Sequence, residues 1–230
     1  MKASPTTPRE RPILFSGPLV RALLRDVDPK TVTRRLIRDE WFRCLDPEDP
    51  EDMPNILAQC PHGVAGDRLW VRETWQMFDP EKDSIPTERL GPRAPHSGVE
   101  NTRKIGWRAC YAADGPLVHP VHGPARWRPS IHMPRWASRI TLEIVSVRVE
   151  RLQDITADEV KAEGLDVPDV DYSVGDSPFA LEAEREAYAR ELFAKFWDSI
   201  NGERASWQSN PWVWRVEFKR VETASLRGGQ

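Results

Sequence analysis

The segment RITLEIVSVRVERLQDITADEVKAEGL, residues 139–165, predicts a long strand that leads directly into a short helix. Apolar and polar side chains alternate through its first half, which is the period of a strand with one buried face. Where two apolar residues adjoin, a bulge is expected. The residues predicted to form the apolar face are Ile140, Leu142, Ile144, Val145 and Val147.

The second half of the segment carries the start and stop signals of a helix of about two turns. Thr156 is suited to cap the N-terminus, and Glu159, three residues later, completes a capping box. Gly164 is suited to the left-handed position that follows a helix C-terminus. Glu163 is therefore expected in the last turn, immediately before the stop.

Further strands and a longer helix are expected on both sides of this segment. The strands are predicted at residues 11–15, 31–37, 66–75, 106–114 and 210–222, and Leu69, Val71 and Glu73 should share one side of the third of these. Ser16 is suited to cap a short helix, and residues 181–200 carry apolar side chains at helical spacing.

This order of elements predicts an α+β fold. Because most of the strands are not separated by long helices, a small mixed β-barrel with short flanking helices is expected rather than a doubly wound sheet. One domain should span residues 11–222, with surface insertions at about 40–62 and 78–104, where proline and polar residues interrupt the pattern. Residues 1–10 and 223–230 are expected to be flexible tails.

The composition favours a reduced, cytoplasmic protein. No apolar run approaches the roughly 20 residues that span a bilayer, and the N-terminus lacks the apolar stretch of a signal peptide. The three cysteines are odd in number and lack CxxC spacing. A net charge of −3 does not indicate a nucleic-acid binder, but 26 of the 33 basic residues are arginines, which suit phosphates and base edges.

Several separated motifs occur in a characteristic order. KTVTRR (30–35) follows the first short helix, GDRLWVRE (66–73) comes next, the long strand leads into ITADEVKAEGL (155–165), and VWRVEF (213–218) lies near the end. In this order the motifs resemble an ASCH domain, a family within the PUA-like superfamily of small β-barrels. The resemblance covers residues 11–38, 66–75 and 131–222, and the layout is similar to phage- and prophage-borne members.

The resemblance implies a cleft that receives RNA or a modified nucleoside. Some small members of the family are amidohydrolases that remove the acetyl group from N4-acetylcytidine. They use a lysine, a threonine three residues later, and a glutamate in the short helix after the long strand. The matching positions here are Lys30, Thr33 and Glu163. Two features depart from those enzymes: Asp28-Pro29 stands where they commonly carry a glycine and a basic residue, and this chain is much longer.

The chemistry explains these residue types. Amide hydrolysis needs a nucleophile, a base and a donor for the developing oxyanion and the leaving amine. Residues i and i+3 of a regular strand point to opposite faces, so Lys30 must belong to the Pro29 turn to share a site with Thr33. A desolvated Lys30 could act as base toward the Thr33 hydroxyl or a water. At the C-terminal end of a helix, the dipole opposes the negative charge of Glu163. A cation such as Lys30 would compensate for this, or Glu163 would be protonated and could donate its proton. The alternative is that the Glu163 side chain is simply solvated.

Arginines and tryptophans supply the candidate contacts to a nucleic acid or substrate. Arg34 and Arg35 are expected to point to opposite faces of the strand, and Arg35 is favoured because it points to the same face as Thr33. Tryptophans can stack a base, although core packing is their more common fate. The candidates are Arg35, Arg72, Trp70, Arg135 and Trp136.

No cofactor and no metal are expected. His119, His122 and His132, with Cys60-Pro-His62, match no known zinc spacing, and the chain lacks a GxSxG elbow and a glycine-rich phosphate loop. Two main functions remain open: a nucleic-acid or modified-nucleotide binding module, and an amidohydrolase that acts on an acylated base. A third is a phage accessory protein that acts through a protein partner. The oligomeric state is open, and no membrane association is expected.

Overall fold

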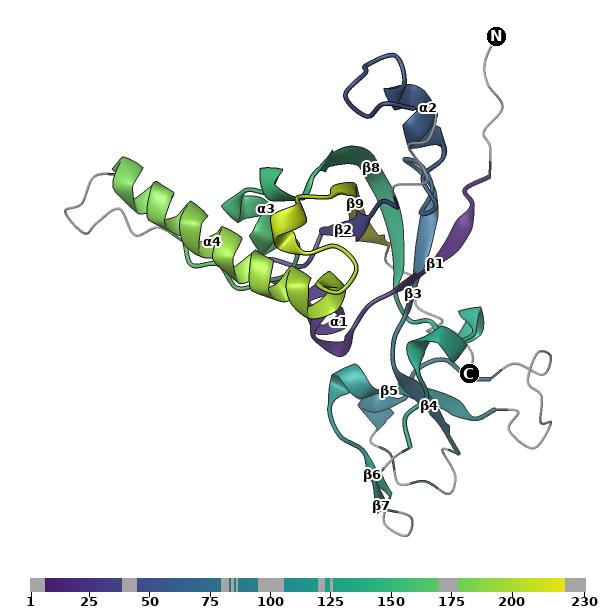
Figure 1. Cartoon of the computed structure of the whole chain (residues 1–230). Coiled ribbons are helices and arrows are strands. Elements are labelled where there is room, and N and C mark those ends of the chain that lie inside the picture. The colour runs from purple at the N-terminus through teal and green to yellow at the C-terminus, as the bar shows by residue number, and fades with distance from the viewer. Residues whose placement is uncertain are drawn as a thin grey trace. The chain divides into compact units, whose positions relative to one another are not determined.

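The computed structural model describes residues 7–38, 45–79, 83, 85, 87–94, 106–119, 123–124, 126–169 and 178–221 (Figure 1). The chain forms two compact units. The first contains Met1–Arg21, Asp67–Glu143 and Arg220–Gln230, and the second contains Ala22–Gly66 and Ile144–Lys219. The single domain with two insertions stays a prediction, because two compact units can belong to one folding domain.

The first unit is built on a short sheet with one buried face. Strand β1 (Glu10–Leu14) runs parallel to β3 (Arg68–Arg72), and β3 runs antiparallel to the first residues of β8 (Thr141–Arg151). Leu69, Val71 and Glu73 are buried, whereas Trp70 and Arg72 on the alternate side are partly exposed. The sidedness predicted for this strand is therefore confirmed.

Two hairpin-like pairs complete the first unit. Strand β4 (Trp75–Phe78) pairs antiparallel with β5 (Arg108–Tyr111), and β6 (Val118–His119) pairs with β7 (Gly123–Pro124). A small core lies beside β4 and β5. Its buried residues are Trp75, Ala109, Tyr111, Met133 and Ala137.

The second unit contains β2 (Val32–Leu36), the rest of β8, and β9 (Trp212–Val221), in the order β8-β9-β2. Strands β2 and β9 are antiparallel, with Arg34 opposite Arg215. The α-helices along the chain are α1 (Gly17–Leu23), α2 (Met53–Ala58), α3 (Ala157–Ala162) and α4 (Pro178–Asn201). Short 3-10 helices occur at Thr87–Arg89, Ala112–Asp114, Ser130–His132, Arg135–Ala137, Leu152–Asp154 and Trp207–Ser209.

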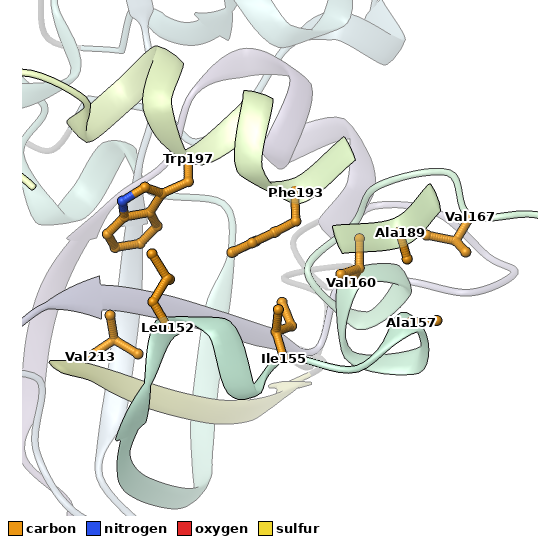
Figure 2. Close-up of a cluster of buried hydrophobic side chains, with 9 residues drawn as sticks. All are labelled: Leu152, Ile155, Ala157, Val160, Val167, Ala189, Phe193, Trp197 and Val213. Atoms are coloured by element: carbon orange, nitrogen blue, oxygen red, sulfur yellow. The ribbon is translucent and has the colours of Figure 1, made fainter. Parts of the chain in front are cut away.

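Helix α4 supplies the apolar residues that close the core of the second unit. Phe193 and Trp197 point from α4 toward Leu152 and Ile155, which follow β8, and Ala189 packs beside Val160 of α3 (Figure 2). The remaining buried members of this cluster are Ala157, Val167 and Val213. The helical spacing that predicted this helix corresponds only in part to its buried face, because Phe193 and Trp197 are buried whereas Tyr188 is 49% exposed.

The strands differ from the sequence prediction in two respects. In neither unit do the described strands close into a barrel, because closure needs pairing between the first and last strands of a sheet and no such pairing joins them. The expected small barrel is thus replaced by open sheets in an α+β chain. Val145 was predicted on the apolar face of β8 but is 46% exposed, since it points opposite to its buried neighbour Ile144.

None of the described helices is both long enough and apolar enough to cross a membrane.

Replacing Phe193 with alanine should lower the free energy of unfolding by about 3–5 kcal/mol, because the side chain is 1% exposed and its loss leaves a cavity. Urea unfolding followed by tryptophan fluorescence measures this loss. Tyr188→Ala, at a 49% exposed position of the same helix, is the matched control and should cost less than about 1 kcal/mol. Equal losses in the two variants would contradict the packing of α4 described here.

Candidate functional site

Two segments far apart in the sequence meet in the second unit. One is the turn that leads from α1 into β2, where Asp28 adopts a positive φ of 48° before Pro29 and Lys30. The other is the C-terminal end of α3, where Glu163 is the C-cap and Gly164 has a φ of 93°. The Thr156 side chain accepts a hydrogen bond from the Glu159 amide, so both ends of the predicted short helix are confirmed.

The turn and the helix end are in close contact. The Thr31 amide donates to the Ala162 carbonyl at 2.9 Å, which ties the start of β2 to α3. A Cβ atom at Gly164 would lie 2.7 Å from the Ala22 Cβ and 3.2 Å from the Lys30 Cβ. Gly164 is therefore required both for its left-handed backbone and for the close approach of Lys30.

A buried ion pair lies at this contact. Lys30 Nζ is 2.7 Å from Glu163 Oε2, and it also donates to the carbonyls of Glu163 at 2.7 Å and Val32 at 2.6 Å. The Lys30 side chain is 0% exposed and that of Glu163 is 3% exposed. An ammonium has three donors, and all three have acceptors here. Burial lowers the pKa of Lys30 from its ordinary value, while the charge of Glu163 opposes that shift.

Arg34 is the second cation at Glu163. Its Nη1 lies 3.4 Å from Glu163 Oε1, its Nε donates to Glu150 at 2.9 Å, and its Nη2 contacts both Glu150 and Glu159. The Arg34 side chain is 0% exposed. Arg35 was favoured for this place because it shares a face of the strand with Thr33, whereas Arg34 makes these contacts. No sequence signal distinguished it, because its partners come from β8 and α3.

Arg34 belongs to a larger ionic network on one face of the sheet. Its cross-strand partner Arg215 donates to Glu159 at 2.8 Å and to Glu217 at 3.0 Å, and Arg148 lies 3.3 Å from Glu159. Among the described residues, these ion pairs join four cations and four carboxylates. They are Lys30, Arg34, Arg148, Arg215, Glu150, Glu159, Glu163 and Glu217.

The carboxylates of the network are in different electrostatic environments. Burial raises the pKa of Glu150, although Arg34 opposes that rise. Burial also acts to raise the pKa of Glu159, but the guanidinium groups of Arg34 and Arg215 outweigh it and hold the pKa below its usual value. The hydrogen bond from Arg215 lowers the pKa of Glu217.

Thr33 is buried in β2 but is not bonded to the ion pair. It is 3% exposed and lies opposite Val216. Adjacent residues of a strand point to opposite faces, so Thr33 and Arg34 project to different sides of β2. Among the described residues, the Thr33 hydroxyl makes no hydrogen bond to Lys30 or Glu163. The predicted amine and carboxylate are thus bonded to each other, whereas the predicted hydroxyl makes no hydrogen bond to either.

Arg35 follows Arg34 and shares the alternate side of β2 with Thr33. Burial lowers the pKa of Arg35, and the negative charge of Glu163 opposes that shift. Arg35 is therefore close enough to the pair to be affected by its charge.

The other predicted binding residues belong to the first unit. The guanidinium groups of Arg72 and Arg135 lie 4.9 and 5.9 Å from the centre of the Trp70 ring. Arg135 also pairs with Glu10 at 2.8 Å. Trp136 instead packs edge-to-face on Trp75, with the ring centres 5.8 Å apart. Three of the candidates therefore form one aromatic and basic cluster on the surface, and Trp136 serves in packing.

A second buried ion pair occurs in the first unit. Arg139 donates to both carboxylate oxygens of Glu73, at 2.9 and 3.0 Å, contacts Asp114 at 2.7 Å, and stacks 3.9 Å from the centre of the Tyr111 ring. Burial raises the pKa of Glu73, with Arg139 opposing. This pair explains how a glutamate can share the buried side of a strand.

An open pocket of about 490 Å³ lies in the second unit. Lys161 bridges Asp28 at 2.9 Å and Asp169 at 3.0 Å within it. Asp28 lies two residues before Lys30, and Lys161 lies two residues before Glu163, so the pocket adjoins the segments that present the ion pair. Its lining residues are Arg25, Val27, Asp28, Lys161, Leu165, Asp166, Val167, Pro168 and Asp169.

No family model, curated protein or solved structure matches this chain. The ASCH resemblance therefore depends on the motifs in the sequence and stays a hypothesis.

Lys30→Met should lower the free energy of unfolding by about 3 kcal/mol, because it removes the nearer cation from a buried carboxylate. Thermal or urea unfolding measures this loss. The control is Lys195→Met, which removes a pair of similar length, 2.6 Å to Glu191, at a 74% exposed position. That variant should unfold nearly as the wild type does. A similar loss in both would show that burial does not determine the strength of the Lys30 pair.

Glu159→Gln should make stability less sensitive to acid. The folded-state pKa of Glu159 lies below its ordinary value of 4.5, so its ionised form stabilises the fold above that pH. This contribution is lost as the pH falls through the folded-state pKa. Unfolding measured from about pH 6 to pH 3 should therefore show a smaller decrease for the variant. Glu184→Gln, at an exposed position of α4, controls for removal of one carboxylate; equal slopes for the two variants would contradict the expectation.

Proposed function

We propose that this chain is an ASCH-type protein of the PUA-like superfamily. In this proposal it binds a nucleic acid or modified nucleotide, and it hydrolyses the amide of an acylated base such as N4-acetylcytidine. The supporting observation is the buried contact of 2.7 Å between Lys30 and Glu163, which are 133 positions apart in the sequence. These are two of the three positions that match the catalytic residues of the family that the sequence resembles.

The proposed chemistry is a hydrolysis. A water or the Thr33 hydroxyl attacks the acyl carbon, and an uncharged Lys30 accepts the proton that the nucleophile loses. The C–N bond then breaks, and the amine of the base leaves with the proton that Lys30 accepted. If water attacks, acetate is released directly; if Thr33 attacks, a second water must hydrolyse the acyl-threonine ester to release acetate. Burial lowers the pKa of Lys30, which is the direction that a base working near neutral pH needs. Because the Thr33 hydroxyl is not bonded to the pair, water is the favoured nucleophile.

The pocket lined by Asp28 and Lys161 is the proposed entry site for the ligand, although neither Lys30 nor Glu163 lines it. Its volume of about 490 Å³ lies within the range of roughly 300–1,000 Å³ that is usual for small-molecule sites. Arg35 is the proposed contact near the pair. Trp70, Arg72 and Arg135 of the first unit are proposed, as a separate surface, to bind a single-stranded nucleic acid. Cys60 and Cys110 are buried, and a cytoplasmic location is part of this proposal.

A non-catalytic module is the second candidate, and one observation favours it. Each of the three ammonium protons of Lys30 already has an acceptor, so no donor is directed at a ligand in this structure. In such a module the pair would shape the binding surface without breaking a bond. An accessory protein that acts through a protein partner is the third possibility, and deletion of 78–98 would test it through loss of that interaction.

Incubation with N4-acetylcytidine, followed by chromatography for cytidine and acetate, tests the hydrolase. The wild type should turn the substrate over, and Glu163→Gln should lower kcat at least about 100-fold. Thr33→Val distinguishes the nucleophiles, because it abolishes turnover only if the hydroxyl attacks. Lys195→Met should retain full activity.

Absence of turnover by the wild type would contradict the hydrolase. If the protein then binds a single-stranded RNA oligonucleotide with an affinity that falls steeply as salt rises, the module is supported. If the wild type shows neither turnover nor RNA binding, both the hydrolase and the binding module are rejected.

A further inference from the structure

Glu163 has two cationic neighbours at unequal distances. Its Oε2 lies 2.7 Å from Lys30 Nζ, whereas its Oε1 lies 3.4 Å from Arg34 Nη1. Both cationic side chains are 0% exposed. The carboxylate is thus held tightly on one side and loosely on the other, with water excluded from both cations.

Lys30 must lose one acceptor before it can donate to a ligand. Two of its acceptors, the carbonyls of Val32 and Glu163, are backbone atoms fixed at the start of β2 and the end of α3. The third, Glu163 Oε2, belongs to a side chain and can move by rotation about χ angles. The carboxylate is therefore the acceptor that can be released at the smallest structural cost.

Release of Lys30 would normally leave a buried carboxylate without a cation, which is strongly unfavourable. Arg34 removes this obstacle. Its Nε and Nη2 are anchored by Glu150 and Glu159, which leaves Nη1 facing Glu163. The guanidinium group is a rigid planar fork that stays charged at any physiological pH. Arg34 is thus a fixed second partner for the carboxylate.

We propose that Arg34 is a positioning residue that receives the Glu163 carboxylate when a ligand engages Lys30. The Lys30 Nζ–Glu163 Oε2 hydrogen bond breaks, the Arg34 Nη1–Glu163 Oε1 contact shortens, and one N–H of Lys30 turns to the ligand. No proton is transferred in this step, and Lys30 must lose one proton in a separate step before it can act as the base of the proposed hydrolysis. This inference depends on the proposed function, because it assigns Lys30 the role of contacting a ligand.

The position of Glu163 indicates the chemical class of that ligand. A neutral carbonyl oxygen that accepts from Lys30 adds no negative charge beside the Glu163 carboxylate. An anion in the same place would be repelled by that carboxylate, which stays within reach of Arg34. The site should therefore select an uncharged amide, such as the acyl group of an acylated base, over a carboxylate or a phosphate.

A first experiment needs no ligand. Crystal structures of Lys30→Met and of Lys30→Gln, a second variant in case the first does not fold, remove the charge of the nearer partner. The Arg34 Nη1–Glu163 Oε1 distance should shorten from 3.4 Å to about 2.9 Å. A carboxylate that stays in place, or that turns away from Arg34, would overturn the proposal.

The second experiment compares two arginines that face each other across β2 and β9. Arg215 contacts Glu159, as Arg34 does, but its described contacts do not include Glu163. With N4-acetylcytidine as the probe, Arg34→Lys should lower kcat/KM at least about 10-fold, whereas Arg215→Lys should change it by less than about 3-fold. Acetate should not compete with the probe.

The outcomes of the two experiments separate the two hypotheses. Shortening of the Arg34 contact without turnover by the wild type would retain the exchange and reject the hydrolase. Turnover with equal effects of the two arginine variants, or competition by acetate at micromolar concentration, would overturn the role of Arg34 while retaining the hydrolase.

Discussion

The contact between Lys30 and Glu163 is the constraint on which the second unit depends. An ammonium and a carboxylate that are both removed from water must be held within hydrogen-bonding distance, since either one alone would be strongly destabilising. The contact fixes the turn before β2 against the end of α3, and Gly164 permits the close approach. Backbone hydrogen bonds between the same two segments, such as that from the Thr31 amide to the Ala162 carbonyl, accompany this contact.

The ionic network around this pair is better explained by specificity than by stability. Buried ion pairs contribute little net stability compared with apolar residues of similar size, because the charges must be desolvated. The second unit nevertheless places Arg34 between three carboxylates, although the apolar cluster around Phe193 lies directly beside it, with the Arg34 guanidinium 6.0 Å from the Phe193 ring. Such an arrangement defines the position of each side chain closely, which suits a site more than a core.

Local patterns in the sequence predicted elements well and predicted their assembly poorly. The cap at Thr156, the stop at Gly164 and the buried side of β3 depend on neighbouring residues alone, and they match the structure. The barrel depended on which strands pair over long distances, which alternation does not encode, and the described strands remain in open sheets. Val145 shows the same limit, because apolar character alone did not fix which face it occupies.

The sequence by itself determined the types of the candidate site residues and the turns that present them: a lysine after Asp28-Pro29, and a glutamate before the glycine that ends a short helix. The contact between them was an expectation drawn from the resemblance, and only the tertiary structure established its geometry and burial. The tertiary structure also decided that Arg34 contacts Glu163 and that the Thr33 hydroxyl does not. The physical reason is that strand parity sends neighbouring side chains to opposite faces, while the packing of α3 against the sheet decides which face carries the charges.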